Sequence, residues 1–483
     1  MSYLGIDLGT SGLRALLVDD NGTPLGSAER HYASQHPYPG WSEQNPADWI
    51  DALDGAVQDL AGRYAEFAEL HGIGVAGHMH GATLLDDHGA VIRPCILWND
   101  SRAHTEAAAL DQTPDVRSIS GNIVFPGFTA PKLKWVQEHE PEHYARVAKV
   151  LLPAAYLNFY LTGDYVADMS DSAGTSWLDV EQRNWSDTLL TAGGMTASQM
   201  PRLVEGCARA GTLRPNLADT WGVPRDVVVA GGAGDNAAAA CGIGVLKEGA
   251  GFLSLGTSGV LLAARDGYFP AADSALHTFC HAVPDRWYQM GVMLSATDSL
   301  NWLGHISGAT PAELTAQLGP DLVAPGRIVF LPYLSGERTP HNDASIRGSF
   351  IGLGHDTGRV ELTRAVLEGV AFGLRDSYEA LQNSGAQLNR LVAIGGGAKS
   401  EYWLKLIATA LNVSLDVPED GEFGAALGAS RLAHIASTQR DPDEILVSPR
   451  IERQVCPDPE LIAAYDDAFS RFRAAYPATR SLI

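Results

Sequence analysis

Leu-Gly-Ile-Asp-Leu-Gly-Thr-Ser-Gly at residues 4–12 and Leu-Ser-Leu-Gly-Thr-Ser-Gly at residues 253–259 decide the fold of this chain. Both stretches contain Leu-Gly-Thr-Ser-Gly, and largely apolar runs follow them at residues 13–18 and 260–264. A glycine-containing turn between two apolar runs is typical of a β-hairpin. Because five identical residues recur in the same predicted context, the sequence favours a duplicated unit over a turn composition that recurs by chance.

Strand-like and helical patterns alternate around both hairpins. In the first half, helical residues 48–71 precede a strand at 72–76, and a strand at 227–230 precedes a helix at 235–241. The second half has a strand at 328–331, a helix at 360–383 and a strand at 391–394 that runs into three glycines. This alternation predicts two α/β lobes that meet near residue 245 across a cleft. We expect lobes at residues 1–245 and 246–445 and a tail at 446–483, which the sequence does not place.

Composition and charge exclude several kinds of partner. The chain has 483 residues, is 45 % hydrophobic, and carries a formal net charge of −23. Such a field repels nucleic acid and anionic membrane surfaces, but glycine turns and helix N-termini still allow a nucleotide to bind within a cleft. Without a long apolar segment or a basic leader, we expect a cytoplasmic protein. Its five cysteines are far apart in sequence and are predicted to be reduced thiols.

The two predicted hairpins can bind a polyphosphate. Their turn amides and their Thr and Ser hydroxyls would face phosphate oxygens from two sides. The chain has no Walker A string, and the glycines at 395–397 are by themselves only a tight turn. Asp7 ends the first strand, where a carboxylate can hold magnesium or simply cap the turn. Ser254 is its counterpart in the second hairpin, so the turn does not require an acid, and this asymmetry favours a function for Asp7.

Asp235 has two interpretations. It follows a strand and three glycines and precedes a helix of small residues, so it could be an ordinary N-cap. It could also be the carboxylate that accepts a proton from a substrate hydroxyl as that hydroxyl attacks a γ-phosphate. The residues alone slightly favour the cap.

Several of these stretches together resemble the FGGY carbohydrate kinases. They are residues 4–12, 231–236, 253–259 and 395–397, with 127–135 and 348–368 similar to the two signatures of the family. The resemblance covers nearly the whole chain. It implies duplicated actin-like or hexokinase-type (ribonuclease H-like) α/β lobes with a cleft between them. Four further strings, at 41–44, 77–82, 96–100 and 334–340, are similar to ketopentose kinases of the family and imply conversion of D-xylulose to its 5-phosphate by ATP and Mg²⁺.

The resemblance assigns roles position by position. Asp235 and Asp7 become catalytic residues and both approach the metal. The sugar would contact Met79, His80, Asp235 and Asn236. The phosphates and adenosine would contact Gly9, Thr10, Ser11, Gly256, Thr257, Ser258, Gly395 and Gly396. The implied partners are a small sugar and ATP, and the resemblance also allows a homodimer.

Other interpretations stay open at this point. Met79 and His80 would more often be core residues, and Glu337 with Arg338 could be a structural ion pair. His78 stands where the family string has glutamine, and Ala154 where lysine is expected. If the His78 imidazole reaches the sugar, the KM for sugar should change with pH near 6.5, the ordinary histidine pKa. The alternative functions are a kinase of another ketose or polyol, such as ribulose, and a non-kinase actin-like ATPase.

Overall fold

The computed structural model describes residues 1–419 and 424–482, so residues 420–423 of the second predicted lobe and residue 483 of the predicted tail lie outside it. The first large sheet has the strand order β13-β14-β5-β1-β2-β3, and β15 also pairs with β5. Strand β2 is antiparallel to both of its neighbours, β1 and β3, whereas β1, β5 and β14 are parallel. The strands are β1 (Ser2–Leu8), β2 (Gly12–Asp19), β3 (Pro24–His31), β5 (Leu70–Gly77), β13 (Arg209–Thr212), β14 (Val228–Ala230) and β15 (Ala233–Gly234).

The second large sheet has the order β18-β19-β17-β16-β22-β23-β24. Strand β17 is antiparallel to both of its neighbours, β16 and β19, whereas β16, β22 and β23 are parallel. The strands are β16 (Gly251–Leu255), β17 (Gly259–Arg265), β18 (His277–Cys280), β19 (Trp287–Met293), β22 (Arg390–Ile394), β23 (Ser414–Pro418) and β24 (Ile451–Val455).

The two sheets repeat one topology. Strands β1, β2, β3, β5 and β14 have the same order and directions as β16, β17, β19, β22 and β23. Three antiparallel strands followed by two parallel strands form the ribonuclease H-like unit of actin-type lobes. The predicted duplication and the predicted fold class are therefore confirmed, and the two hairpins that carry the repeated sequence are β1–β2 and β16–β17.

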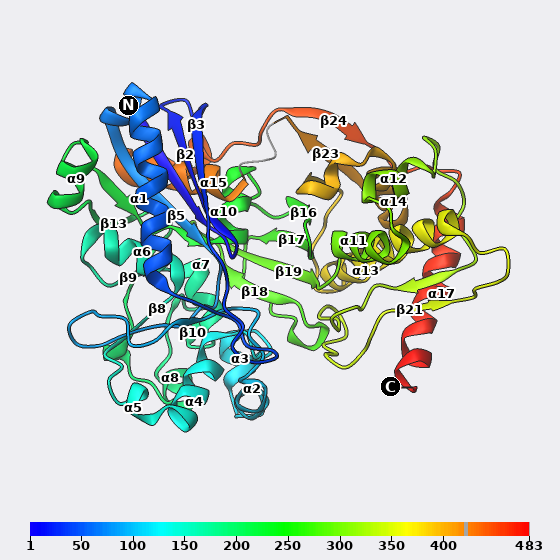
Figure 1. Ribbon diagram of the computed structural model, residues 1–483, viewed down its shortest axis with the longest axis horizontal. Coiled ribbons are helices and arrows are strands. Elements are labelled where there is room, and N and C mark those ends of the chain that lie inside the picture. The colour runs from blue at the N-terminus through cyan, green and yellow to red at the C-terminus, as the bar shows by residue number, and fades with distance from the viewer. Residues whose placement is uncertain (420–423, 483) are drawn as a thin grey trace.

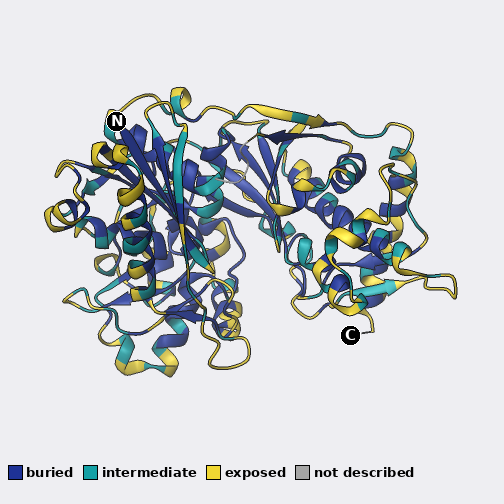
Figure 2. Cartoon of the chain, turned by 45° about the horizontal axis from the view of Figure 1, so that its top comes forward, coloured by how far each residue is buried: buried dark blue, intermediate teal, exposed yellow. Residues whose placement is uncertain are grey.

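Two helices form a layer between the sheets. Helix α15 (Gly424–Thr438) packs on β1, β5 and helix α10 (Asp235–Gly242), although it follows the second sheet's β23 in the chain. The close approach requires glycine at position 74 of β5, because a Cβ there would lie 1.9 Å from the Ala429 carbonyl oxygen. Helix α1 (Pro46–Arg63) packs on β2 and β3. Figure 2 shows that buried residues fill both sheets and that exposed residues gather on the outer loops and helices.

The remaining chain surrounds this centre, as Figure 1 shows. The other α-helices are α2 (His104–Asp111), α3 (Val116–Ser120), α4 (Thr129–His139), α5 (Pro141–Tyr144), α6 (Pro153–Thr162), α7 (Met169–Ser172), α8 (Asp187–Ala192), α9 (Pro215–Trp221), α11 (Thr297–Ser307), α12 (Pro311–Ala316), α13 (Arg359–Asn383), α14 (Glu401–Leu411), α16 (Pro442–Ile445) and α17 (Ile462–Arg480). Two-stranded sheets pair β4 (Glu43–Gln44) with β7 (Cys95–Ile96), β6 (Thr83–Leu85) with β8 (Lys149–Leu151), β9 (Val166–Asp168) with β12 (Arg202–Val204), β10 (Leu178–Asp179) with β11 (Asn184–Trp185), and β20 (Val329–Leu331) with β21 (Ser349–Ile351).

Some local expectations need correction. The helix expected at 48–71 ends at Arg63, and a short 3₁₀ turn at Ala65–Glu69 leads into β5. The tail that the sequence did not place adds β24 to the second sheet, and α17 packs on α14 and β20. The five cysteines are free, as predicted. None of the described helices combines the length and apolar character that crossing a bilayer requires.

Candidate active site

The turn of the first hairpin is held by side chains from three later segments. The Gln44 amide nitrogen donates to the Thr10 carbonyl oxygen at 2.6 Å, and the Trp98 indole donates to the Thr10 hydroxyl at 2.9 Å. The Tyr32 hydroxyl donates to the Gly9 carbonyl oxygen at 2.6 Å. The Gly9 amide donates to the Gly12 carbonyl oxygen at 3.0 Å, which closes the turn. With these contacts the turn keeps one conformation, and the Thr10 hydroxyl, which accepts from Trp98, can still donate to a ligand.

Asp7 lies beside this turn, on the face of β1 that turns toward the helices between the sheets. Successive side chains of a strand alternate, so Asp7 shares its face with Tyr3, which belongs to a core cluster with Ala426 of α15. Burial and, after it, the negative charge of Asp235 raise the pKa of the Asp7 carboxyl to about 7, against the opposing effect of Arg14. Two carboxylates from different segments therefore face a common region.

Asp235 is the first residue of α10, and the N-cap of that helix is Gly234. The predicted N-cap role is therefore wrong as stated. One Asp235 carboxylate oxygen accepts hydrogen bonds from the backbone and side-chain amides of Asn236, at 2.7 and 2.8 Å. Burial raises the pKa of Asp235 to about 6, against the effect of these two hydrogen bonds. A carboxylate with a pKa near neutrality is suited to accept a proton from a hydroxyl.

The turn before Asp235 is held by hydrogen bonds that involve two other residues of the first lobe. The Gly234 amide donates to the Ser170 hydroxyl at 3.1 Å, and that hydroxyl donates to an Asp168 carboxylate oxygen at 2.6 Å. All three residues are buried. This chain of hydrogen bonds sets the position from which the Asp235 side chain projects.

A cavity of about 260 Å³ lies between the lobes and brings together many of the predicted residues. The first lobe contributes Met79, His80, Trp98, Gly127, Phe128, Asp235 and Asn236, and the second contributes Ser254, Gly256, Ser258, Val260, His277, Met290, Val292 and Arg338. The cavity thus unites the predicted sugar residues with the predicted base and with part of the second hairpin. Its volume and its mixture of aromatic and polar walls suit a small polyhydroxylated molecule.

His80 faces this cavity in a fixed orientation. Its Nδ1 lies 2.7 Å from the Gly174 carbonyl oxygen, and its ring stacks on Phe128 at 4.4 Å between ring centroids. Because a carbonyl oxygen only accepts, the proton is on Nδ1 and Nε2 is an acceptor. Burial lowers the pKa of His80 to about 3, so the ring is neutral. Its backbone φ of 67° is in the left-handed region, and its carbonyl oxygen accepts from the Lys132 ammonium at 2.8 Å.

Met79 and His78, which precede His80 in the chain, have different environments. Met79 is 4 % exposed and lies under Gly234, so it is both a core residue and part of the cavity wall. His78 is 3 % exposed and does not line the cavity. Burial lowers the pKa of His78 to about 3. The hypothesis that its imidazole reaches the sugar and titrates near 6.5 is therefore wrong, because the ring packs in the interior beside Trp49.

The second hairpin opens onto a separate cavity of about 630 Å³ in the second lobe. Leu255, Gly256, Thr257, Thr297, Leu300, Asn301, Pro311, Ala312, Thr315, Gly396, Gly397, Lys399, Ser400 and Trp403 line it. The carbonyl oxygens of Gly256 and Thr257 accept from backbone amides at the start of α11, which anchors this hairpin. A ligand in this cavity could extend past Gly256, which lines both cavities, toward Asp235.

Gly395 and Gly396 directly follow β22, at the edge of the cavity beside the second hairpin. Gly395 has a φ of 88°, and a Cβ at this position would lie 2.8 Å from the Leu255 carbonyl oxygen, so only glycine fits. Gly395 and Gly396 also line a third cavity of about 460 Å³, on the side of Arg14. Of the two, Gly396 alone lines the cavity that contains Thr257.

Glu337 and Arg338 do not form the ion pair that the sequence left open. A Glu337 carboxylate oxygen accepts from the backbone amides of Leu294 and Arg338, at 3.1 and 2.7 Å. The Arg338 guanidinium instead reaches the cavity that contains Asp235.

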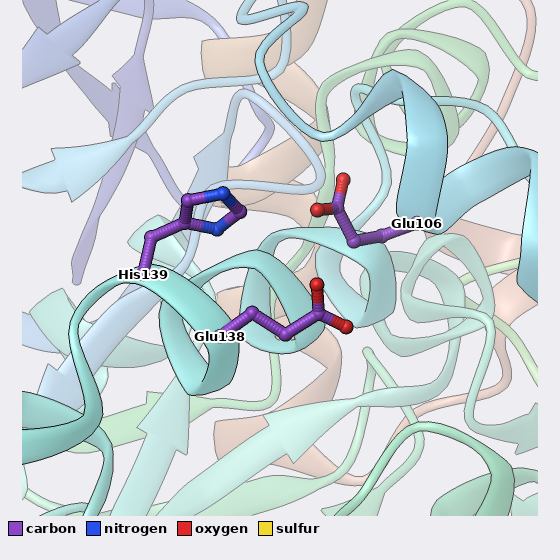
Figure 3. A group of neighbouring side chains, drawn as sticks. All are labelled: Glu106, Glu138 and His139. Atoms are coloured by element: carbon purple, nitrogen blue, oxygen red, sulfur yellow. The ribbon is translucent and has the colours of Figure 1, made fainter.

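One group of described residues has the spacing of metal ligands, and it lies away from the cleft. Glu106 of α2 and Glu138 and His139 of α4 have possible ligand atoms within 4.8 Å of one another (Figure 3). Two of the three side chains are exposed. Asp7 and Asp235 do not belong to this group, but both offer the oxygen ligands that Mg²⁺ prefers, and the charge of Asp235 raises the pKa of Asp7, so the pair suits a divalent cation.

Sequence reasoning missed several parts of the site. Gln44 and Trp98 lie within strings that were singled out only as similar to the family, and the structure now shows that both hold the first hairpin. Phe128 lies within the signature-like residues 127–135 but was given no role, and Tyr32 and His277 had no distinguishing pattern of their own. They join the site because separate elements converge there, which no local spacing reveals.

The duplicated sheets, the paired hairpins and the carboxylates at the cavity define a two-lobed sugar kinase. Residues 2–242 match the N-terminal domain of the FGGY family of carbohydrate kinases, and residues 251–437 match its C-terminal domain. The chain belongs to this family, and the phosphoryl donor of such a kinase is ATP. The predicted boundary at residue 245 falls between the two matches, whereas the ranges of the lobes remain a prediction.

The particular relatives are kinases of one sugar. The xylulose kinase of Escherichia coli K12 is 45 % identical over 478 residues, 98 % of each chain. That of Klebsiella pneumoniae is 45 % identical over 467 residues, 96 % of each chain. The crystal structure of a xyloylose kinase from Brucella ovis has 56 % sequence identity and a TM-score of 0.98, and the match covers all of both chains. Nothing in these comparisons favours the non-kinase actin-like ATPase.

Proposed function

We propose that this protein transfers the γ-phosphoryl group of Mg-ATP to D-xylulose and forms D-xylulose 5-phosphate. The observation that carries the proposal is the single cavity that contains Asp235 and is bounded by residues of both lobes, including Gly256 and Ser258 of the second hairpin. The named activity of the full-length relatives supports the choice of sugar.

Asp235 acts as the general base in this proposal. Its carboxylate orients the terminal hydroxyl of the sugar and takes the proton as that hydroxyl attacks the γ-phosphate. Asn236 holds the carboxylate through two hydrogen bonds to one oxygen, at 2.7 and 2.8 Å, which leaves the other oxygen for the substrate. The neutral His80 ring accepts a sugar hydroxyl at Nε2, because its Nδ1 proton is donated to Gly174.

The phosphates lie along the two hairpins. Turn amides and the hydroxyls of Thr10, Ser11, Thr257 and Ser258 stabilise the charge on the transferring group. When bound, Mg²⁺ would be held by Asp7 and Asp235 and would supply positive charge against the phosphate oxygens. Adenosine occupies the cavity of about 630 Å³ beside Gly396, and Gly395 shapes the strand end that supports it.

The test is ADP formation with a panel of ketopentoses, ketohexoses and pentitols. We expect the largest kcat/KM with D-xylulose, and NMR of the product should place the phosphate on carbon 5. A larger kcat/KM with a ribulose or a polyol would overturn the sugar assignment, and ADP formation that no sugar stimulates would overturn the kinase assignment. The cytoplasmic location and the homodimer remain predictions, which cell fractionation and light scattering can test.

A further inference from the structure

Arg338 is held rigidly at the wall of the sugar cavity. Its loop runs beside β19, where the Thr339 amide donates to the Val292 carbonyl oxygen at 3.1 Å and the Val292 amide donates to the Thr339 hydroxyl at 3.0 Å. On the other side, Glu337 exchanges two backbone hydrogen bonds with Asp343, at 2.9 and 2.8 Å. Because the backbone is fixed on both sides of Arg338, its side chain starts from a fixed position, and the guanidinium lines the cavity.

The Arg338 guanidinium contacts an aromatic ring and a histidine. Its central carbon lies 4.3 Å from the centroid of the Phe125 ring, and Nη1 lies 3.4 Å from His277 Nε2. Within residues 1–419 and 424–482, no carboxylate forms an ion pair with it, and Glu337 is engaged by backbone amides. A buried guanidinium is usually paired, so one that lines a cavity and forms no ion pair has N–H donors to offer a ligand.

His277 orients this group without adding charge. Arginine only donates, so His277 Nε2 is the acceptor and its proton is on Nδ1. Burial and the neighbouring Arg338 lower the pKa of His277 well below its ordinary value, so the ring is neutral. Burial lowers the pKa of Arg338 only to about 10, so the guanidinium stays charged at neutral pH.

Arg338 and Asp235 line one cavity from different lobes. Arg338 lies beside His277, whose ring packs against Phe128, and Phe128 stacks on His80. Asp235 lies with Asp7, beside the first hairpin. In a 2-ketose that is phosphorylated at its terminal hydroxyl, the carbonyl lies near the opposite end of the carbon chain. A carbonyl oxygen carries no proton and accepts only, whereas every sugar hydroxyl can both donate and accept.

We propose that Arg338 donates hydrogen bonds to the carbonyl oxygen of the ketose and so selects the open-chain ketose over the corresponding polyol. This inference rests on the proposed function, because it needs a ketose in the cavity with its terminal hydroxyl at Asp235. The nearby acceptors, His80 Nε2 and the Asp235 carboxylate, suit hydroxyl groups and cannot bind a carbonyl oxygen.

The test compares two variants on matched sugars. We measure the Kd of Arg338→Met and Arg338→Lys for D-xylulose and for the pentitols formed by its reduction, together with kcat, the KM for Mg-ATP and the melting temperature. Arg338→Met should weaken ketose binding about 10- to 100-fold, the range for loss of a charged hydrogen bond. Pentitol binding and the KM for Mg-ATP should change little. Arg338→Lys keeps the charge but not the planar fork, so its loss for the ketose should be smaller.

Arg327→Met is the matched control, because Arg327 is 55 % exposed and pairs with Asp356. It should leave both affinities at the wild-type values. Equal losses for ketose and pentitol in Arg338→Met, or no loss for either, would overturn the proposal. A preference of the wild-type protein for an aldonate over the ketose, lost in Arg338→Met, would also overturn the proposal. In that case Arg338 would bind a carboxylate.

Failure of this inference is distinguishable from failure of the proposed function. The wild-type panel identifies the preferred ketose first, and the Arg338 comparison uses that ketose and its own polyols. A preference for another ketose would overturn only the assignment of D-xylulose. If Arg338→Met does not fold, the same comparison with Arg338→Lys decides, because a selective loss for the ketose supports the proposal and an equal loss overturns it.

Discussion

Replacing Asp235 with asparagine removes proton acceptance and one carboxylate of the proposed metal pair, and it leaves Asp7 and both hairpin turns in place to bind Mg-ATP. The present carboxylate oxygen accepts from the two amides of Asn236, and an asparagine oxygen can keep both hydrogen bonds. The N-cap of α10 is Gly234, so helix capping does not depend on position 235. We therefore expect Asp235→Asn to fold, to bind Mg-ATP at near wild-type affinity, and to have a melting temperature close to that of the wild type.

The expected kinetic loss is large. A general base contributes about 10²–10⁴-fold to the rate, which corresponds to roughly 3–5 kcal/mol of barrier. The pH dependence of the wild-type rate gives a second expected change. With a pKa of about 6, the Asp235 carboxyl is about nine-tenths ionised at pH 7 and about one-tenth ionised at pH 5. Since only the ionised form accepts a proton, wild-type kcat/KM should fall at least about tenfold from pH 7 to pH 5.

The assay is coupled ADP release with saturating Mg-ATP, run on wild type and Asp235→Asn over this pH range. Asp7, whose pKa is raised to about 7, titrates over a similar range, so the contribution of Asp235 is the difference between the two profiles. Asp416→Asn is a control for loss of a buried carboxylate away from Asp235, because Asp416 lies in β23 and accepts a hydrogen bond from Gln454. A variant that retains more than about a third of the wild-type kcat, far short of a ~10²-fold general-base effect, would refute Asp235 as the base.

Three further predictions follow from burial and hydrogen bonding. His78→Gln should leave the pH profile of the sugar KM unchanged, because burial lowers the pKa of His78 to about 3 and its ring is uncharged in the assay range; a pH dependence that the substitution removes would contradict this. Trp98→Phe loses the hydrogen bond to Thr10 and should raise the KM for Mg-ATP about 2- to 10-fold, whereas Trp185→Phe, whose indole binds only the Pro201 carbonyl, should not. Burial lowers the pKa of Lys132 from 10.5 to about 7, so above pH 7 the folded protein has lost a proton that the unfolded chain retains, and stability rises with pH by up to about 1.4 kcal/mol per unit. Urea unfolding between pH 7 and 8.5 should show that this contribution is absent from Lys132→Met, and parallel curves for the two proteins would count against it.

The hairpins and their residues were accessible to sequence reasoning because they are local. A strand, a glycine turn and a second strand are specified within about ten residues, so residues 4–12 and 253–259 predict both position and duplication. The alternation of strands and helices likewise predicts the two lobes. The position of Asp235 at a strand-to-helix turn was also visible, although its role as a cap or as a base was not.

The site beyond the hairpins depended on residues that are distant in sequence. Gln44 and Trp98 both reach Thr10 because the pairing of β4 with β7 brings their two segments together. Arg338 lines the same cavity as Asp235 because its loop pairs beside β19. No spacing in the chain encodes such contacts, and this is why Arg338 looked like half of a structural ion pair.

The sequence by itself determined the repeated unit, the phosphate turns and the residue types at the cleft, because turn geometry and strand alternation act over a few neighbouring residues. Only the tertiary structure decided which of these residues share a cavity and how each one titrates. The pKa values of His78, His80 and Asp235 are set mainly by burial, and burial comes from segments far away in the chain. Helix α15 shows the same limit, since it follows β23 of the second sheet in sequence and yet packs on the first sheet, where Gly74 allows a close backbone contact.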